Sequence, residues 1–178
     1  MRRLIGIRKR LISLNYIQFL GLQIVLGLSI SIVQFVILSV SQITTPLTRF
    51  EGQSYTFISF LSVLVISAAI ETLLFQYLPF VLTSNRKKAA SSNKTFKPTQ
   101  YILCSSVLFG LFHIIGTHWM MPFVVLKVLG ATLCGVVLSV SFYILHRKKQ
   151  RPFLSVSLIH FLINSILVCA GAMMDLLG

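Results

Sequence analysis

The stretch "VISAAIETLLFQYLPF" (residues 65–80) is an apolar run with one carboxylate, Glu71, in its middle. The whole chain of 178 residues has three acidic residues, Glu51, Glu71 and Asp175, against sixteen Lys and Arg. Hydrophobic residues make up 56% of the chain and charged residues 11%, which is about half the charged fraction of a soluble globular protein. Long apolar runs between clustered charges are typical of a polytopic membrane protein. We therefore expect Glu71 to lie within a membrane-spanning helix, where a carboxylate is unusual.

Each of five apolar runs is near or above the roughly 20 residues that a helix needs to cross the hydrocarbon layer. They predict spans over about 14–40, 56–82, 101–118, 123–145 and 153–177, of which the third is the shortest. The segments between them include polar stretches at 41–54 and 83–100 and a short uncharged turn at 118–122. The expected fold class is all-α, a polytopic transmembrane helical bundle. Residues 1–178 form one integral membrane domain, with residues 1–55 holding the N-terminal basic segment, the first span and an outer loop.

The positive charges predict the orientation of these spans. Segments 1–10, 83–100 and 146–151 hold five, five and four Lys or Arg, whereas the segments on the other side hold only Arg49. By the positive-inside rule the N-terminus is cytoplasmic, and five spans put the C-terminus outside. Lys127, one turn inside the fourth span, is expected to extend its amine to the outer interface.

The placement of the charges also excludes a function class. A nucleic-acid-binding patch needs a folded surface that presents it, but these charges lie in the short gaps between apolar runs. We expect them to contact anionic lipid headgroups instead, in a cell membrane and most simply a bacterial plasma membrane. The three cysteines all fall within apolar runs without CxxC spacing and are expected to be packing residues.

Small residues on the fourth span predict close helix contacts. Gly130 and Cys134, and likewise Ala131 and Gly135, are spaced i, i+4. Small residues at this spacing let membrane helices approach closely. We expect this helix to have a packing role.

Polar residues deep inside the predicted spans are few: Glu71, Gln76, His113, His160 and Asn164. An ionisable group within a span costs about 2.5–3.5 kcal/mol on insertion scales, so each is a candidate site residue. At about 1.5 Å per helical residue, the carboxylate of Glu71, the two imidazoles and the amide of Asn164 lie in one layer, roughly 10–18 Å from the cytoplasmic ends of their spans. His118 and His146, at span ends, are explained by the interface.

The chemistry of this set suits peptide hydrolysis. A carboxylate in a low-dielectric pocket can take a proton from water, and a histidine beside it can hold that water. A second histidine and an amide one turn apart can donate hydrogen bonds to the oxyanion on the attacked carbonyl. Phe109 lies one turn from His113 on the same helix face. The alternative is a buried polar cluster that only fixes the helix register.

Three segments resemble the signatures of a known family: "ETLLFQ" (71–76), "FGLFH" (109–113) and "HFLIN" (160–164). The CPBP family of CAAX-protease and bacteriocin-processing intramembrane proteases, also called the type II CAAX prenyl endopeptidase or Abi family, has the patterns EExxxR, FxxxH and HxxxN or HxxxD on successive helices. The resemblance covers roughly residues 60–175, with matching order and spacing.

The resemblance implies a role for each matching residue. Glu71 corresponds to the base that activates the attacking water, and His113 to the histidine that positions it. His160 and Asn164 correspond to the pair assigned to the oxyanion. The family is often described as metalloproteases, but this chain has no HExxH pair, which favours catalysis without a metal. Glu71, His113 and His160 could still supply three ligands, so a divalent metal such as zinc stays open.

Two positions differ from the family pattern. Thr72 stands in place of the second glutamate, and Gln76 in place of the arginine. Losing both members of an ion pair strands neither charge, which is milder than losing one. The i, i+4 spacing of Thr72 and Gln76 predicts a hydrogen bond between them.

The expected function is an intramembrane endopeptidase that cleaves a peptide or a lipid-modified protein, in a context of bacteriocin processing or self-immunity. An alternative is a weak or inactive family member that acts in self-immunity or as a membrane interaction protein. A third reading is a membrane cytochrome with His113 and His160 as haem ligands. The sequence does not indicate the substrate or the oligomeric state.

Overall fold

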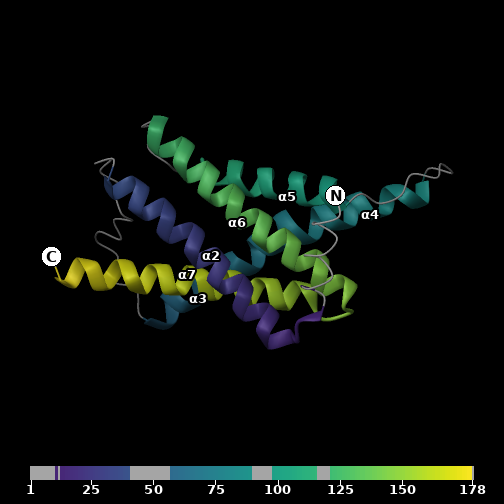
Figure 1. Cartoon of the computed structure of the whole chain (residues 1–178), viewed down its shortest axis with the longest axis horizontal. Helices are drawn as coiled ribbons and strands as arrows, with labels where there is room; N and C mark the ends of the chain where they lie inside the picture. The colour runs from purple at the N-terminus through teal and green to yellow at the C-terminus, as the bar shows by residue number, and fades with distance from the viewer. Residues whose placement is uncertain (1–10, 12, 41–56, 90–97, 116–120, 178) are drawn as a thin grey trace.

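The computed structural model describes residues 11, 13–40, 57–89, 98–115 and 121–177. Every regular element among them is a helix, so the predicted all-α bundle is confirmed for this part of the chain. Figure 1 shows the elements in chain order. They are α2 (Tyr16–Val40), α3 (Phe57–Thr72), the π-helical turn η1 (Leu73–Tyr77), α4 (Leu78–Ala89), α5 (Pro98–Phe112), α6 (Met121–Arg147) and α7 (Pro152–Leu177).

Within the described residues, four stretches are long and apolar enough to cross a membrane, as expected for an integral membrane protein. They are Tyr16–Gln34, Leu61–Ser84, Val124–Arg147 and Pro152–Cys169. They belong to four of the five predicted spans. The third predicted span differs because α5 has only 15 residues.

The third span was predicted to end at residue 118, but α5 ends at Phe112. The next three amides bond to carbonyls three residues back, with His113 N–H donating to the carbonyl of Gly110 at 3.1 Å. This tighter turn closes the helix, which therefore covers about 22 Å of the roughly 30 Å hydrocarbon layer. His113 thus lies just past a helix end and not inside a helix.

The second span differs in the other direction. Its predicted end was residue 82, but α4 continues through the basic segment to Ala89. Hydropathy marks where the apolar surface ends, whereas backbone hydrogen bonds can extend a helix into polar sequence. The predicted polar loop 41–54 and residues 118–120 of the predicted turn, with His118, lie outside the described residues.

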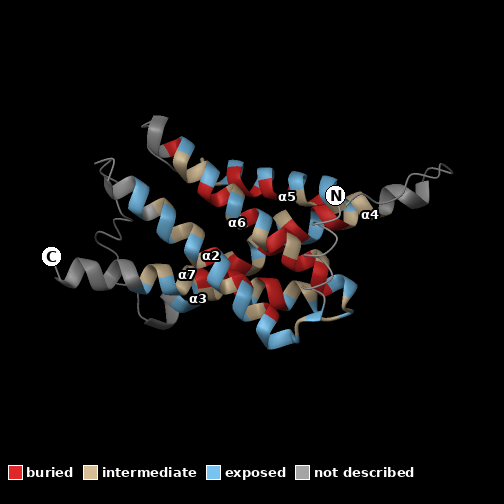
Figure 2. Cartoon of the chain, in the orientation of Figure 1, coloured by how far each residue is buried: buried red, intermediate tan, exposed pale blue. Residues whose placement is uncertain are grey.

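Helix α6 is the centre of the packing. It contacts α2, α5 and α7, while α3 packs against α7 and α4 against α5. Buried residues gather where these helices meet, and the outward faces are exposed (Figure 2). Large apolar side chains such as Ile17, 80% exposed, and Leu103, 67% exposed, lie on those outward faces. In a membrane protein such faces are covered by lipid.

The small residues predicted on the fourth span do lie at close helix contacts. A Cβ added at Gly135 would come within 3.0 Å of the Ser106 Cα and 3.2 Å of the Phe109 Cβ, both on α5. A Cβ at Gly130 would meet the Gln34 side chain of α2. The absence of side chains at these two glycines lets α6 pack against α5 and α2.

We predict that Gly135→Leu lowers the thermal midpoint of the purified protein in detergent. The added side chain has to push α5 away, and overpacking of this kind costs about 1–3 kcal/mol. Gly21→Leu is the matched control, because a Cβ there meets nothing within 4 Å. An equal drop in both variants would show that Gly135 has no special packing role.

Candidate active site

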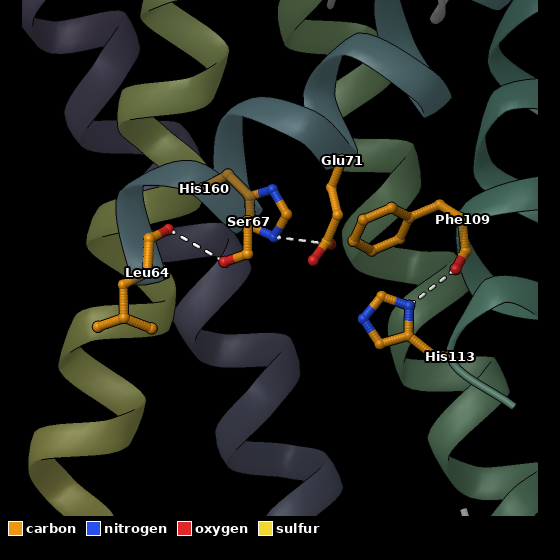
Figure 3. Close-up of polar contacts among 6 residues, drawn as sticks. All are labelled: Leu64, Ser67, Glu71, Phe109, His113 and His160. Carbon is orange, nitrogen blue, oxygen red and sulfur yellow. Dashed lines mark hydrogen bonds and ion pairs between the residues drawn. The ribbon is translucent and has the colours of Figure 1, made fainter. Parts of the chain in front are cut away.

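Glu71 and His160 face each other across the contact between α3 and α7. The Nε2 atom of His160 lies 3.5 Å from Oε2 of Glu71, and their side chains are 5% and 18% exposed. Figure 3 shows the Glu71 carboxylate between the rings of His160 and Phe109. The predicted meeting of a carboxylate and an imidazole from two separate helices is therefore observed.

His113 is oriented by a hydrogen bond to the last turn of α5, the helix that it follows. Its Nδ1 atom lies 2.8 Å from the carbonyl oxygen of Phe109. Because a carbonyl only accepts, Nδ1 carries the proton, and a neutral ring then has Nε2 as its acceptor. Figure 3 shows the His113 ring below the ring of Phe109, with the Glu71 carboxylate between these two rings and that of His160.

The ring of Phe109 contacts the rings of both histidines. Its ring centroid is 4.6 Å from that of His113 and 5.5 Å from that of His160, with an edge-on arrangement at His160. The predicted shared face of Phe109 and His113 is thus confirmed. Since Phe109 is only 2% exposed, it fixes both imidazoles from a rigid position in the core.

Asn164 lines a cavity of about 200 Å³ that lies between α2, α5, α6 and α7. This site cavity has room for several waters at about 30 Å³ each. Its lining includes His113, His160 and Asn164, which confirms that His160 and Asn164 share a helix face. The other lining residues are Ser31, Gln34, Phe109, Lys127, Ala131, Cys134, Leu138, Ile163 and Leu167.

Two polar atoms at the centre of the site are buried without a hydrogen-bond partner among the described residues. They are Oε2 of Glu71 and Nδ1 of His160. Buried polar groups are nearly always satisfied, and exceptions gather at functional sites. A bound water or a group of the substrate could supply the missing hydrogen bonds.

The three candidate metal ligands are not gathered into a metal centre. Among the described residues, no group of three or more His, Cys, Asp or Glu side chains is arranged to hold a metal ion. Glu71 and His160 are close, and His113 keeps Nε2 free as an acceptor, but the three side chains do not converge on one point. The donor set does not fit the metal option that the sequence left open.

The hydrogen bond predicted between Thr72 and Gln76 does not form. Both residues are fully buried, and neither Oγ1 of Thr72 nor either amide atom of Gln76 has a partner among the described residues. The reason is the π-helical turn η1, which closes i to i+5 from Leu73 to Leu78. Residues four apart no longer stack directly above one another in such a turn.

Hydroxyl groups from two neighbouring helices hold η1 in place. Oγ of Ser105, on α5, donates to the carbonyl of Phe75 within η1. Oγ of Ser139, on α6, lies 2.6 Å from Oγ of Ser105. Since π-helical turns recur at functional sites, we interpret this pair of serines as support for the helix that carries Glu71.

The sequence interpretation missed the contributions of α2 and α6 to the site cavity. Ser31 and Gln34 of α2 line it, although α2 lies outside the segment that resembles the family. A glutamine in an apolar run was a visible signal. Lys127 was expected to extend to the interface, but it lines the same cavity as His113.

The fold and the site define a helical integral membrane protein with a Glu–His–His–Asn group, in which His160 is buried and the other three side chains are half-buried. The chain matches the family described as Type II CAAX prenyl endopeptidase Rce1-like over residues 53–166, which is more than half of its length. The chain belongs to this family, as its three motifs indicated. No curated protein and no solved structure matches it significantly.

We predict that Ser105→Ala destabilises η1 whereas Ser106→Ala does not. Ser105 bonds to a carbonyl of another element, and a buried carbonyl left without its donor costs about 1–3 kcal/mol. The Ser106 hydroxyl bonds only to the carbonyl of Ile102 within its own helix. Hydrogen–deuterium exchange over residues 72–80 measures the difference. Equal exchange in the two variants would contradict the support role.

Proposed function

We propose that this protein is an intramembrane endopeptidase that hydrolyses a peptide bond with a water activated by Glu71. The observation that carries the proposal is the 3.5 Å approach of His160 to Glu71 beside a cavity lined by His113 and Asn164. Membership in a type II CAAX prenyl endopeptidase family supports protease activity at the level of the family.

In the proposed mechanism, a water beside Glu71 loses a proton to the carboxylate as its oxygen attacks the peptide carbonyl. The Nε2 atom of His113 accepts a hydrogen bond from this water and orients it. The attack breaks the carbonyl π bond and places a negative charge on its oxygen. The oxyanion then re-forms the carbonyl and the C–N bond breaks, while Glu71 returns the proton to the leaving amine, so that the water is divided between the two products.

The developing oxyanion requires donors. The Asn164 amide has two N–H groups in every protonation state of the site, and it shares the site cavity with His160. Nε2–H of His160, which faces Oε2 of Glu71 at 3.5 Å, becomes free to donate to the oxyanion once Glu71 has taken the proton from the water. Removing one donor of this kind typically costs about 10²–10³ in kcat.

The proposed substrates are peptides or lipid-modified proteins that reach the site from the membrane. Bacteriocin processing or self-immunity in a bacterial plasma membrane remains part of this proposal. The basic segments would contact anionic headgroups and hold the protein in its predicted orientation.

An inactive or weak family member is the second candidate function. It is favoured by Thr72 and Gln76, whose buried polar atoms lack partners among the described residues. The helix that carries Glu71 is held less firmly by these unsatisfied groups than it would be by a Glu–Arg ion pair at the same two positions. In this case the protein would act by binding a peptide or another membrane protein.

We predict that Glu71→Gln removes cleavage while His146→Ala does not. Loss of a general base reduces the rate by about 10²–10⁴. His146 has an exposed side chain whose ring lies 4.5 Å from that of Phe80, away from the site cavity. The measurement is mass spectrometry of membrane-protein N-termini and secreted peptides from cells with wild type, a deletion or either variant at matched expression.

New N-termini that appear with the wild type and with His146→Ala, but are absent with Glu71→Gln and in the deletion, support protease activity. If Glu71→Gln instead yields the same termini as the wild type and restores any phenotype of the deletion, the protein acts by binding.

A double-mutant cycle tests the role of Thr72 and Gln76, the two positions that differ from the family pattern. We predict that Gln76→Arg alone lowers the thermal midpoint, because an unpaired buried charge costs about 3–5 kcal/mol. Adding Thr72→Glu should restore much of this loss and should not lower any cleavage rate. Loss of stability in the double variant equal to the sum of the single losses would exclude an ion pair at these positions.

A further inference from the structure

Lys127 is a cation inside the site cavity. It lies on α6 and is half-buried, and it shares the cavity with His113, His160 and Asn164. Among the described residues, no acidic side chain lines this cavity, and none lies within ion-pair distance of Lys127. Glu71, the acidic residue whose side chain is described, faces His160 instead.

A charge of this kind within a membrane protein calls for a partner. An intramembrane Lys costs about 2.5–3.5 kcal/mol on insertion scales and normally pairs with an anion or serves a pathway. Extension of the amine to the interface would remove that cost, but Lys127 lines the cavity together with the two histidines and Asn164 of the candidate site. The protein therefore presents positive charge where a substrate would enter.

The remaining polar lining of the cavity is neutral. Gln34 and Ser31 of α2 and Asn164 of α7 offer amide and hydroxyl groups. Gln34 is packed against Gly130 of α6, which limits where its amide can move. A cation surrounded by neutral hydrogen-bond donors suits a carboxylate ligand. Each carboxylate oxygen accepts two hydrogen bonds, so these donors and the cation can bind it together.

We propose that the site cavity is a subsite for a carboxylate of the peptide substrate, and that Lys127 is the residue that selects it. The carboxylate is either the C-terminus of the peptide or an acidic side chain near the cleaved bond. This proposal builds on the endopeptidase function and names its substrate class as anionic peptides. It gives a role to a charged residue that the proposed hydrolysis does not use.

Cys134 offers a reporter inside the same cavity. Cys104 and Cys169 are exposed and would be replaced by alanine, which leaves one cysteine in the chain. The first measurement compares the rates at which Cys134 reacts with an anionic and a cationic methanethiosulfonate of similar size, in phosphatidylcholine nanodiscs. A preference for the anionic reagent is expected, and Lys127→Gln should reduce it at least about tenfold while Lys127→Arg retains it.

Peptide probes then test the ligand class. N-acetyl-Ala-Ala with a free C-terminus, the same peptide as its amide, and N-acetyl-Glu-Ala amide are compared for protection of Cys134. Protection by one or both carboxylate-bearing peptides, but not by N-acetyl-Ala-Ala amide, supports the proposal and identifies the source of the carboxylate. This protection should disappear in Lys127→Gln and remain in Arg147→Gln, whose side chain is exposed at the other end of α6.

Three results would overturn the proposal. The first is equal protection by acid and amide peptides or by none of them. The second is protection that Lys127→Gln leaves unchanged. The third is loss of protection when phosphatidylglycerol is added to the nanodiscs, which would assign the cavity to a lipid headgroup. Glu71→Gln keeps this readout separate from catalysis, because protection should persist in that variant whether or not the wild type cleaves peptides.

Discussion

The contact between Glu71 and His160 is the interaction on which the site depends. It joins α3 to α7, and these two helices also pack against each other. A carboxylate inside a membrane protein has no bulk water to solvate it, so it must find a partner from another helix. The register of α3 against α7 is therefore set by chemistry as well as by apolar packing.

The surrounding core keeps this contact in place. Phe109 holds both imidazoles through ring contacts, and the close approach at Gly135 brings α5, which carries Phe109, against α6. The π-helical turn after Glu71 is held by Ser105. Ring contacts and hydrogen bonds thus position Glu71, His113 and His160 within the segment that matches the family.

The sequence predicted the helices and the main site residues because each leaves a strong local signal. Apolar runs mark spans, and Glu71, His113, His160 and Asn164 are rare polar residues inside them. The π-helical turn was not predicted, although Pro79 is a local signal for it, because proline has no N–H to donate to the Phe75 carbonyl four residues back. The position of Lys127 at the cavity could not be predicted from one helix alone, because residues of several helices form the cavity.

The short helix α5 has a consequence for the surrounding lipid. Its 15 residues cover about 22 Å, roughly 8 Å less than the hydrocarbon thickness. Lipids beside a short hydrophobic segment adapt to this hydrophobic mismatch by local thinning of the bilayer. His113 stands at the end of this helix, so the thinned zone lies next to the site. A water molecule or a polar peptide would then cross less hydrocarbon to reach Glu71 there than at any of the longer helices.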